Sequence, residues 1–324
     1  MGVPNTPAIS RRRAFRILAA STLLLVDTGC VGMSRSADAL LYDTHAHFFS
    51  SDTARYPQDL RGAREGEDHL RARIAASPNT PEHVLSVWRE NAVEGGVAVQ
   101  YAEVYKRDNR FVLDSGDRFP DKIAVVVILD PLSPDSPGEL RRLVREHGVA
   151  GVRLTGGPAA DGNYAWLDAA GTRALWQVAD ELRLAVVIMT LPSELSRPAL
   201  QRVAENARRF PNAQVVLDHV GWARPGDDLH ALHAAIGEHG NVSLKLTTIN
   251  LERIELEGGN ASEYVRQVVS LFGAHRVMWG SDFGRTALPY GAMVDRLRTA
   301  MSGLSPAEKR SLMHDTGAHV FRRR

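Results

Sequence analysis

The sequence predicts a single-domain α/β protein, a (β/α)8 TIM barrel over residues 40–324. Short, nearly continuous apolar runs alternate with longer helical segments, as expected for parallel strands that are buried on both faces. Eight such runs occur in regular strand-then-helix order, which favours a closed barrel over an open sheet. No repeat and no low-complexity linker divides these residues, and their number is typical of one barrel domain.

Residues 1–39 differ in character from the rest of the chain. Arg11, Arg12 and Arg13 precede an apolar run of ten residues, Ile17–Val26. Such a run is too short to span a bilayer, and its basic flank is typical of an export signal. The Arg-Arg pair followed by Phe15 resembles a twin-arginine signal. We therefore expect export through the twin-arginine route, to the periplasm in a cell with two membranes.

Two positions in this leader are candidates for its maturation. Ala37-Asp38-Ala39 offers a small-x-small site for ordinary cleavage. Cys30 lies where a lipoprotein cysteine follows an apolar run, although Asp27 occupies the place where such a motif has leucine. Cleavage after Ala39 and a lipid anchor at Cys30 both remain open.

The composition excludes several classes of protein. Residues 40–324 carry a net charge of −2, which argues against an electrostatic nucleic-acid binder. The chain has one cysteine, so an intrachain disulfide and a cysteine-cluster zinc site are both excluded. We expect no transmembrane span. The sequence leaves open whether the protein is a monomer or a homo-oligomer.

The expected strands are rich in β-branched and other apolar residues. They are residues 40–45, 97–101, 123–129, 149–154, 185–189, 214–218, 242–246 and 276–280. The expected helices between them include residues 82–93, 139–147, 172–182, 199–210 and 261–272, and a closing helix lies over 304–321 with Ser305 as N-cap. Residues 48–81 are expected to form a long loop, either a cover for the barrel mouth or a surface loop without a role.

Asp43-Thr44-His45-Ala46-His47 ends the first expected strand. Residues two apart in a strand face the same side, so His45 and His47 can reach one metal ion with neutral imidazole nitrogens. A His-x-His pair is weak evidence alone, but it gains weight at the carboxyl end of a barrel strand, where active sites of this fold lie.

Two further polar residues end later strands. Asp282 follows the eighth strand, so barrel closure brings it next to the first; it can bind a metal, accept a proton from water, or cap a helix. His219 follows the sixth strand and is a candidate for polarising a substrate carbonyl, the alternative being a buried histidine bonded to backbone. By strand alternation, we expect Asp218 to point the other way and to be structural.

Arg153 and Lys245 are cations within the fourth and seventh strands, where a barrel interior is usually apolar. A buried charge has to be paired or used in function. Arg153 is therefore a candidate for holding a substrate carboxylate, with a salt bridge in the barrel mouth as the alternative. Lys245 is a second, weaker candidate for substrate binding.

Four motifs in order, Asp-x-His-x-His, Gly-Val-Arg-Leu, Leu-Asp-His-x-Gly and Trp-Gly-Ser-Asp-Phe, resemble those of the amidohydrolase superfamily. The likeness extends over nearly all of residues 41–321 and is closest to the branch that includes lactonases and decarboxylases of the aminocarboxymuconate-semialdehyde type. The resemblance implies that His45, His47 and Asp282 form the floor of the site, with His219 beside them and Asp282 as proton acceptor for water.

The chain departs from this resemblance in the fifth strand. Many members have a zinc-binding histidine at its end, where this chain has Met189, and a thioether is a poor zinc ligand. The lactonase-like members also tend to lack that histidine. One divalent metal ion, zinc first among the candidates, and a metal-free site therefore both remain open.

Three functions compete at this point. The first is a hydrolase that opens a lactone or related carboxylic ester, with Asp282 activating water and a small, carboxylate-bearing molecule as substrate. The second is a metal-dependent decarboxylase of a small carboxylic acid. The third is a barrel that has lost catalysis and binds a ligand; the joint presence of His45, His47 and Asp282 argues against it.

Overall fold

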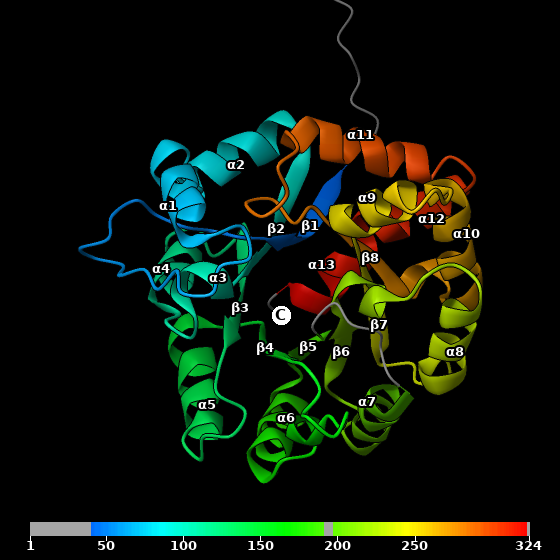
Figure 1. Ribbon diagram of the computed structural model, residues 1–324, viewed down its shortest axis with the longest axis horizontal. Helices are drawn as coiled ribbons and strands as arrows, with labels where there is room; N and C mark the ends of the chain where they lie inside the picture. The colour runs from blue at the N-terminus through cyan, green and yellow to red at the C-terminus, as the bar shows by residue number, and fades with distance from the viewer. Residues whose placement is uncertain (1–39, 191–196, 323–324) are drawn as a thin grey trace, which may run out of the picture. The chain divides into compact units, whose positions relative to one another are not determined.

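The computed structural model describes residues 40–190 and 197–322, and these form an eight-stranded parallel barrel surrounded by helices. Figure 1 shows the strands in the centre and the helices around them. Each strand pairs with the next in sequence order, β1 through β8, which confirms the TIM barrel. The strands are β1 (Leu41–Ala46), β2 (Val93–Val99), β3 (Ile123–Ile128), β4 (Gly151–Gly156), β5 (Ala185–Thr190), β6 (Gln214–Leu217), β7 (Val242–Thr247) and β8 (Val277–Gly280).

Polar contacts between β1 and the end of β8 close the ring. The N–H of Asp282 donates to the carbonyl of His45 at 2.7 Å, and the N–H of His47 donates to the carbonyl of Phe283 at 2.8 Å. A Cβ on Gly280 would lie 2.5 Å from the Cβ of His45, so only glycine allows this close approach. The seam therefore places the residues after β8 directly against β1.

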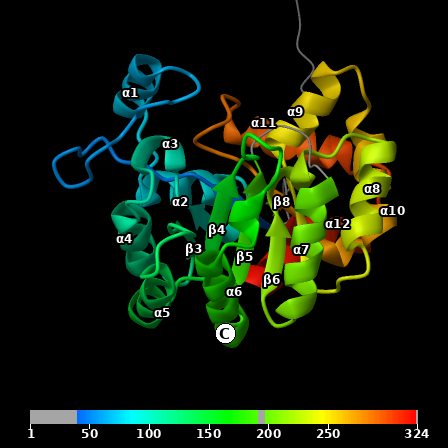
Figure 2. The ribbon, with the colours of Figure 1, turned by 60° about the horizontal axis from the view of Figure 1, so that its bottom comes forward.

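The helices that cover the barrel follow the expected order. Figure 2 shows α5, α6 and α7 packed outside β3 to β6. They are α1 (Glu67–Ala76), α2 (Pro81–Glu90), α3 (Ala102–Tyr105), α4 (Arg110–Arg118), α5 (Ser136–His147), α6 (Ala170–Leu182), α7 (Arg197–Arg209), α8 (Asp227–Ile236), α9 (Thr248–Leu256), α10 (Ala261–Phe272), α11 (Tyr290–Ala300), α12 (Pro306–Arg310) and α13 (Thr316–Phe321).

The boundary between α2 and β2 differs from the expected one. The helix ends at Glu90 and the strand begins at Val93, four residues earlier than predicted. Gly95 and Gly96 resemble a strand breaker in sequence, yet they pair with Tyr42 and Asp43 of β1. A Cβ on Gly96 would lie 2.3 Å from the carbonyl oxygen of Asp43, so these glycines permit a close strand contact.

The long segment after β1 contains a helix that the sequence analysis missed. Within residues 48–81, α1 buries Leu70 and Ile74. Arg73 of α1 donates to the carbonyl of Gly284 at 2.6 Å and to the hydroxyl of Tyr101 at 3.1 Å. The segment is thereby tied to the loop after β8 and forms part of the barrel mouth.

The barrel interior is apolar near the amino ends of the strands and polar near their carboxyl ends. Val97, Val126, Val187 and Met278 pack together there, and Phe321 of α13 joins this cluster. Figure 1 shows α13 in red within the ring of strands. Because this apolar cluster fills the amino end of the barrel, a functional site is expected at the carboxyl end.

The proposed leader, residues 1–39, and the candidate lipidation site Cys30 lie outside the described residues. Among the residues that are described, no helix is long and apolar enough to cross a membrane.

Candidate active site

A β-bulge in β1 sets the direction of its two histidines. Asp43 pairs with Gly96 and Ala46 with Ala98, so three steps along β1 match two along β2. The extra residue interrupts the inward-outward alternation and re-aims the side chains that follow. His45 and His47 consequently lie together at the carboxyl end of the barrel.

His45, His47 and Asp282 bring three donor atoms to one point. His45 Nε2 and His47 Nε2 lie 3.6 and 3.4 Å from Asp282 Oδ1, and the two nitrogens are 3.3 Å apart. The three residues are at most 4% exposed. The strand ends therefore meet as the sequence predicted for these residues.

An acceptor on the far side of each imidazole favours a lone pair that points into this cluster. His47 Nδ1 lies 2.9 Å from the carbonyl oxygen of Val99, which can only accept, so Nδ1 carries the proton and Nε2 does not. His45 Nδ1 faces Asp218 Oδ1 at 3.5 Å. A proton on Nδ1 is favoured there too, and two lone pairs would then face each other at 3.3 Å.

This donor set fits a metal ion. Two imidazole nitrogens bound to one tetrahedral zinc ion lie about 3.3 Å apart, and a cation relieves the repulsion between their lone pairs. A carbonyl or carboxylate that holds the other ring nitrogen is the usual support of a metal-binding histidine. A second cluster, His45, Asp218 and His219, fits less well because two buried cations already contact Asp218.

The charge states of the cluster follow from burial and neighbours. Burial lowers the pKa of His45 to about 3, although Asp218 opposes the shift. Burial alone would raise the pKa of Asp282, but His47, His45 and His219 hold that pKa well below its usual range. At neutral pH His45 is therefore a neutral imidazole and Asp282 a carboxylate.

His219 lies beside this cluster on a turn with unusual backbone geometry. β6 ends at Leu217, and His219, Val220 and Gly221 have φ of 56°, 50° and 58°. The His219 ring lies 5.4 Å from that of His45 between centroids and stacks on Trp222 at 4.4 Å. Burial lowers its pKa to about 4, against the opposite effect of Asp282.

The expected outward direction of Asp218 is wrong. Asp218 continues the inward face of Val216, and the left-handed turn at His219 breaks the alternation, so that His219 faces the interior as well. Asp218 accepts a hydrogen bond from Arg153 Nε at 2.8 Å and lies 2.9 Å from Lys245 Nζ. Burial alone would raise the pKa of Asp218, but Lys245 and Arg153 lower it well below its usual value.

The ion pairs with Asp218 leave Arg153 and Lys245 with different prospects of binding substrate. Lys245 is fully buried and does not line the cavity above the cluster, so its charge serves Asp218 in this structure. Arg153 is 5% exposed and does line that cavity, while it keeps its bond to Asp218. A substrate-binding role therefore remains a prediction for Arg153 and has no geometric support for Lys245.

The cavity above the cluster has a volume of about 340 Å³ and a positively charged wall. His47, His219 and Asp282 lie in its lining. Four cations line it as well, against Glu103 and Asp282 as the acidic residues; these cations are Arg64, Lys106, Arg153 and Arg285. Glu103 lies 3.6 Å from both Arg64 and Arg285, so it neutralises only part of this charge.

Sequence reasoning missed the residues that support Asp282. The Asp43 carboxylate accepts hydrogen bonds from the Ser281 N–H at 2.8 Å, the Ser281 hydroxyl at 2.6 Å and the Tyr290 hydroxyl at 2.9 Å. Asp282 itself has φ of 57°, a strained value for a residue with a side chain. The Asp43–Ser281 bonds fix the backbone on one side of it. Asp43 is the first residue of the Asp-x-His-x-His motif, so the motif could have drawn attention to it, but the sequence analysis gave this residue no role.

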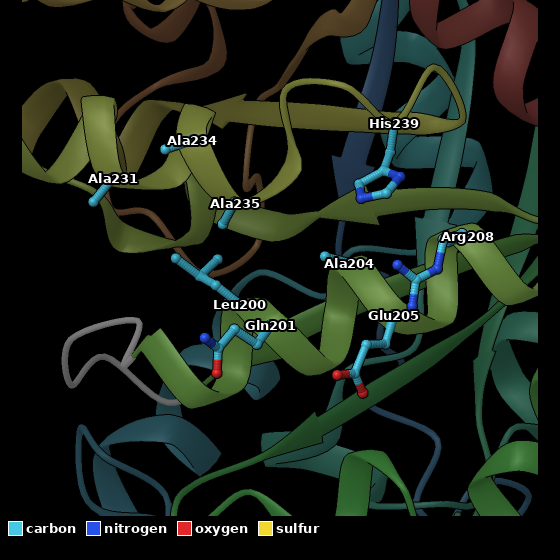
Figure 3. Close-up of a pocket in the computed structure, with 9 residues that line it drawn as sticks. All are labelled: Leu200, Gln201, Ala204, Glu205, Arg208, Ala231, Ala234, Ala235 and His239. Atoms are coloured by element: carbon cyan, nitrogen blue, oxygen red, sulfur yellow. The ribbon is translucent and has the colours of Figure 1, made fainter.

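A larger hollow lies on the outside of the barrel. Figure 3 shows it between α7 and α8, lined by small and aliphatic side chains such as Leu200, Ala204 and Ala235. Its volume is about 690 Å³. Neither candidate metal cluster lies in it. The smaller cavity over Asp282 is therefore the candidate active site.

The comparisons with known proteins assign the family. The family model for amidohydrolases matches residues 42–323. This chain belongs to the amidohydrolase family. An L-fucono-1,5-lactonase from Burkholderia ambifaria is 30% identical over 217 residues, which are 63% of this chain and 69% of the relative. The resemblance drawn from the four motifs is thereby confirmed.

Two solved structures illustrate the shared fold of amidohydrolases. One is a protein from Acinetobacter baumannii described as a probable 2-pyrone-4,6-dicarboxylic acid hydrolase, with citric acid bound; it has a TM-score of 0.67 and 18% identity over 87% of this chain and 98% of its own. The other is an amidohydrolase from Burkholderia multivorans with bound zinc; it has a TM-score of 0.63 and 23% identity over 87% of this chain and 99% of its own. At these identities the likeness shows the fold.

Proposed function

We propose that this amidohydrolase is a hydrolase that opens lactones or related carboxylic esters. The observation that carries the proposal is the convergence of His45 Nε2, His47 Nε2 and Asp282 Oδ1 at 3.3–3.6 Å beneath a cavity at the carboxyl end of the barrel. The likeness to a lactonase at 30% identity supports the ester class of substrate.

In this proposal Asp282 accepts the proton of the attacking water. Among the described residues that line the cavity, Glu103 lies near Arg64 and Arg285, whereas Asp282 has no Lys or Arg partner and is ionised at neutral pH. A carboxylate in this state takes up a proton when water attacks a carbonyl carbon. Arg153, at the cavity wall, is placed to stabilise negative charge on the substrate.

His45, His47 and Asp282 would hold one divalent metal ion, with zinc as the first candidate. When bound, such an ion supplies Lewis-acid polarisation of the ester carbonyl and lowers the pKa of a bound water. Met189 lines the cavity, but the Thr155 hydroxyl lies 3.4 Å from its sulfur, and a thioether adds little to a zinc site.

The positive wall favours an acyl substrate that carries a carboxylate. Four cations against two carboxylates leave the cavity lining with a net positive charge, which attracts and orients an anion. We therefore propose a small carboxylate-bearing lactone as substrate.

The test is hydrolysis of a panel of five- and six-membered lactones, some neutral and some carboxylate-bearing. Hydrolysis is measured as the release of protons into a weakly buffered solution. Hydrolysis by the wild-type protein that is lost in Asp282→Asn supports the proposal. Absence of any lactone opening, together with carbon dioxide release from small aromatic or unsaturated carboxylic acids, would establish the decarboxylase alternative. Absence of both activities would favour the ligand-binding alternative.

We further propose that the protein is exported through the twin-arginine route, on the basis of the paired arginines and the short apolar run in residues 1–39. A fusion of residues 1–39 to a folded reporter tests this. Export that is lost when Arg12 and Arg13 are both changed to lysine supports the proposal, and mass spectrometry of the exported protein decides between cleavage after Ala39 and lipidation at Cys30.

A further inference from the structure

His219 is held by a buried chain of polar side chains that starts on the helix after β7. His219 Nδ1 lies 2.7 Å from Thr247 Oγ1, and Thr247 Oγ1 lies 2.9 Å from Asn250 Oδ1. The three residues are at most 4% exposed. The positions of the hydrogen atoms in this chain can be assigned, because it contacts backbone groups that can only donate or only accept a hydrogen bond.

The orientation of the Asn250 amide is fixed by two backbone groups. The Thr247 N–H donates to Asn250 Oδ1 at 2.9 Å, and Asn250 Nδ2 donates to the carbonyl oxygen of His219 at 2.7 Å. A backbone N–H can only donate and a carbonyl can only accept, so the amide cannot be flipped. The atom that faces the Thr247 hydroxyl is therefore an acceptor.

The Thr247 hydroxyl must then give its proton to Asn250. If it donated to His219 instead, two oxygen acceptors would face each other at 2.9 Å without a hydrogen between them. Because the one hydroxyl hydrogen is committed, Thr247 Oγ1 accepts from His219 Nδ1. The proton of neutral His219 lies on Nδ1, and Nε2 carries the lone pair.

We propose that Thr247 and Asn250 are positioning residues that hold His219 as its Nδ1–H tautomer, so that the ring offers the substrate an acceptor instead of an N–H donor. The inference rests on the proposed lactone hydrolysis for its catalytic meaning, while the tautomer itself is a property of the resting protein. His219 then accepts a hydrogen bond from a substrate hydroxyl or from the reacting water, and stabilisation of the carbonyl oxygen falls to other groups such as Arg153.

This assignment also indicates a feature of the substrate. His219 lines the cavity, and a bound substrate excludes water from it. An acceptor left without a donor in that complex is costly, so the best substrate should place a hydroxyl group near His219. A hydroxylated lactone satisfies Nε2, whereas the corresponding deoxy lactone leaves it unpaired. We expect loss of that hydroxyl to lower kcat/KM by about tenfold or more in the wild-type protein.

The experiment uses nitrogen-15 NMR of histidine-labelled protein loaded with zinc. His219 is identified among the twelve histidines by comparison with His219→Gln. We expect Nδ1 protonated in the wild type and in Thr247→Ser, which keeps the hydroxyl. In Thr247→Val and Asn250→Leu, we expect the proton to move wholly or partly to Nε2, with kcat reduced by about 100-fold and KM changed far less.

Thr247→Ser is the matched control, because it keeps the hydroxyl and should keep the Nδ1–H tautomer. Thermal melting confirms that each variant is folded; if Asn250→Leu is not, Thr247→Val and Thr247→Ser decide. A wild-type proton on Nε2, or an unchanged tautomer in folded Thr247→Val, overturns the inference. If the wild type opens no lactone, the proposed function fails, and the nitrogen spectra still decide the tautomer.

Discussion

The carboxylate of Asp218 lies 2.9 Å from the ammonium of Lys245 at a depth where neither side chain reaches solvent. Arg153 shares the same carboxylate from the cavity side at 2.8 Å. An ion pair buried so deeply gains little over an apolar pair, but either member alone would be an uncompensated charge. The consequence is a strong coupling between these residues in the free energy of unfolding.

We expect Asp218→Asn to lower the free energy of unfolding by about 3–5 kcal/mol, because it leaves the buried ammonium of Lys245 without a carboxylate. The double variant Asp218→Asn with Lys245→Met should recover much of that loss. Urea unfolding measures both. Arg298→Met, which removes an exposed pair with Asp295, should change stability by less than about 0.5 kcal/mol. Additive losses in the double variant would contradict the coupling.

We expect Asp282→Asn to reduce kcat for lactone opening by about 10²–10⁴-fold, because the amide cannot accept the proton of water. The substitution keeps the size of the side chain, so substrate binding should change much less. Steady-state kinetics on the best lactone of the panel measures the effect. Asp114→Asn, which alters an exposed partner of Arg55, should leave kcat unchanged. Retention of kcat in Asp282→Asn would remove this residue from the mechanism.

We expect the protein purified without a polyhistidine tag or chelator to contain about one divalent ion per chain, with zinc predominant. His45→Ala and His47→Ala should lose that ion, because each removes one of three converging donors. Elemental analysis for zinc, manganese and iron measures it. His83→Ala, on the surface helix α2, is the matched control. Lactone opening by a metal-free wild type would instead establish a mechanism that depends on Asp282 and the histidines alone.

We expect Arg153→Met to raise KM for carboxylate-bearing lactones by about tenfold or more, and to raise KM for neutral lactones much less. The reason is the position of the guanidinium in the cavity wall. Arg153→Lys should recover part of the effect, because it keeps the charge but not the bidentate geometry. Equal losses for charged and neutral lactones would point to a role confined to the ion pair with Asp218.

We expect the metal-free protein to lose stability as the pH falls from 7 towards 5. Burial lowers the pKa of His45 to about 3 and that of His219 to about 4, while the unfolded chain protonates both near pH 6.5. The unfolded state therefore binds more protons in this window, and the free energy of unfolding should drop by roughly 1–2 kcal/mol per pH unit. Urea unfolding at several pH values measures the slope. His219→Gln should have a shallower slope, and an unchanged slope would show that His219 is not held neutral.

Much of the fold could be predicted from sequence because a barrel strand is buried on both faces and has a distinctive apolar run. β3 and β5 lie within a residue of their expected ranges for this reason. The start of β2 was missed because the role of Gly95 and Gly96 depends on a partner strand about fifty residues away. Helix α1 was missed because its surface is mainly polar and only Leu70 and Ile74 are buried.

The candidate site divides in the same way. His45, His47 and Asp282 could be placed together because each ends a strand at one rim of the barrel. The shared inward direction of Asp218 and His219 could not be predicted, since it depends on the left-handed turn at His219. The supporting bonds of Thr247 and Asn250 belong to a capping box at the start of α9, a local Thr-x-x-Asn signal that the sequence analysis did not use.

The seam between β1 and β8 joins His45 to Asp282 across 237 positions of the chain. Contacts of such long sequence separation form late, because a large loop has to close before they add any stability. Every strand from β1 to β8 can be paired in order while the histidines and their carboxylate are still apart. Refolding should therefore restore the circular dichroism of the helices before it restores metal affinity, and a measurable interval should separate a folded scaffold from a competent enzyme.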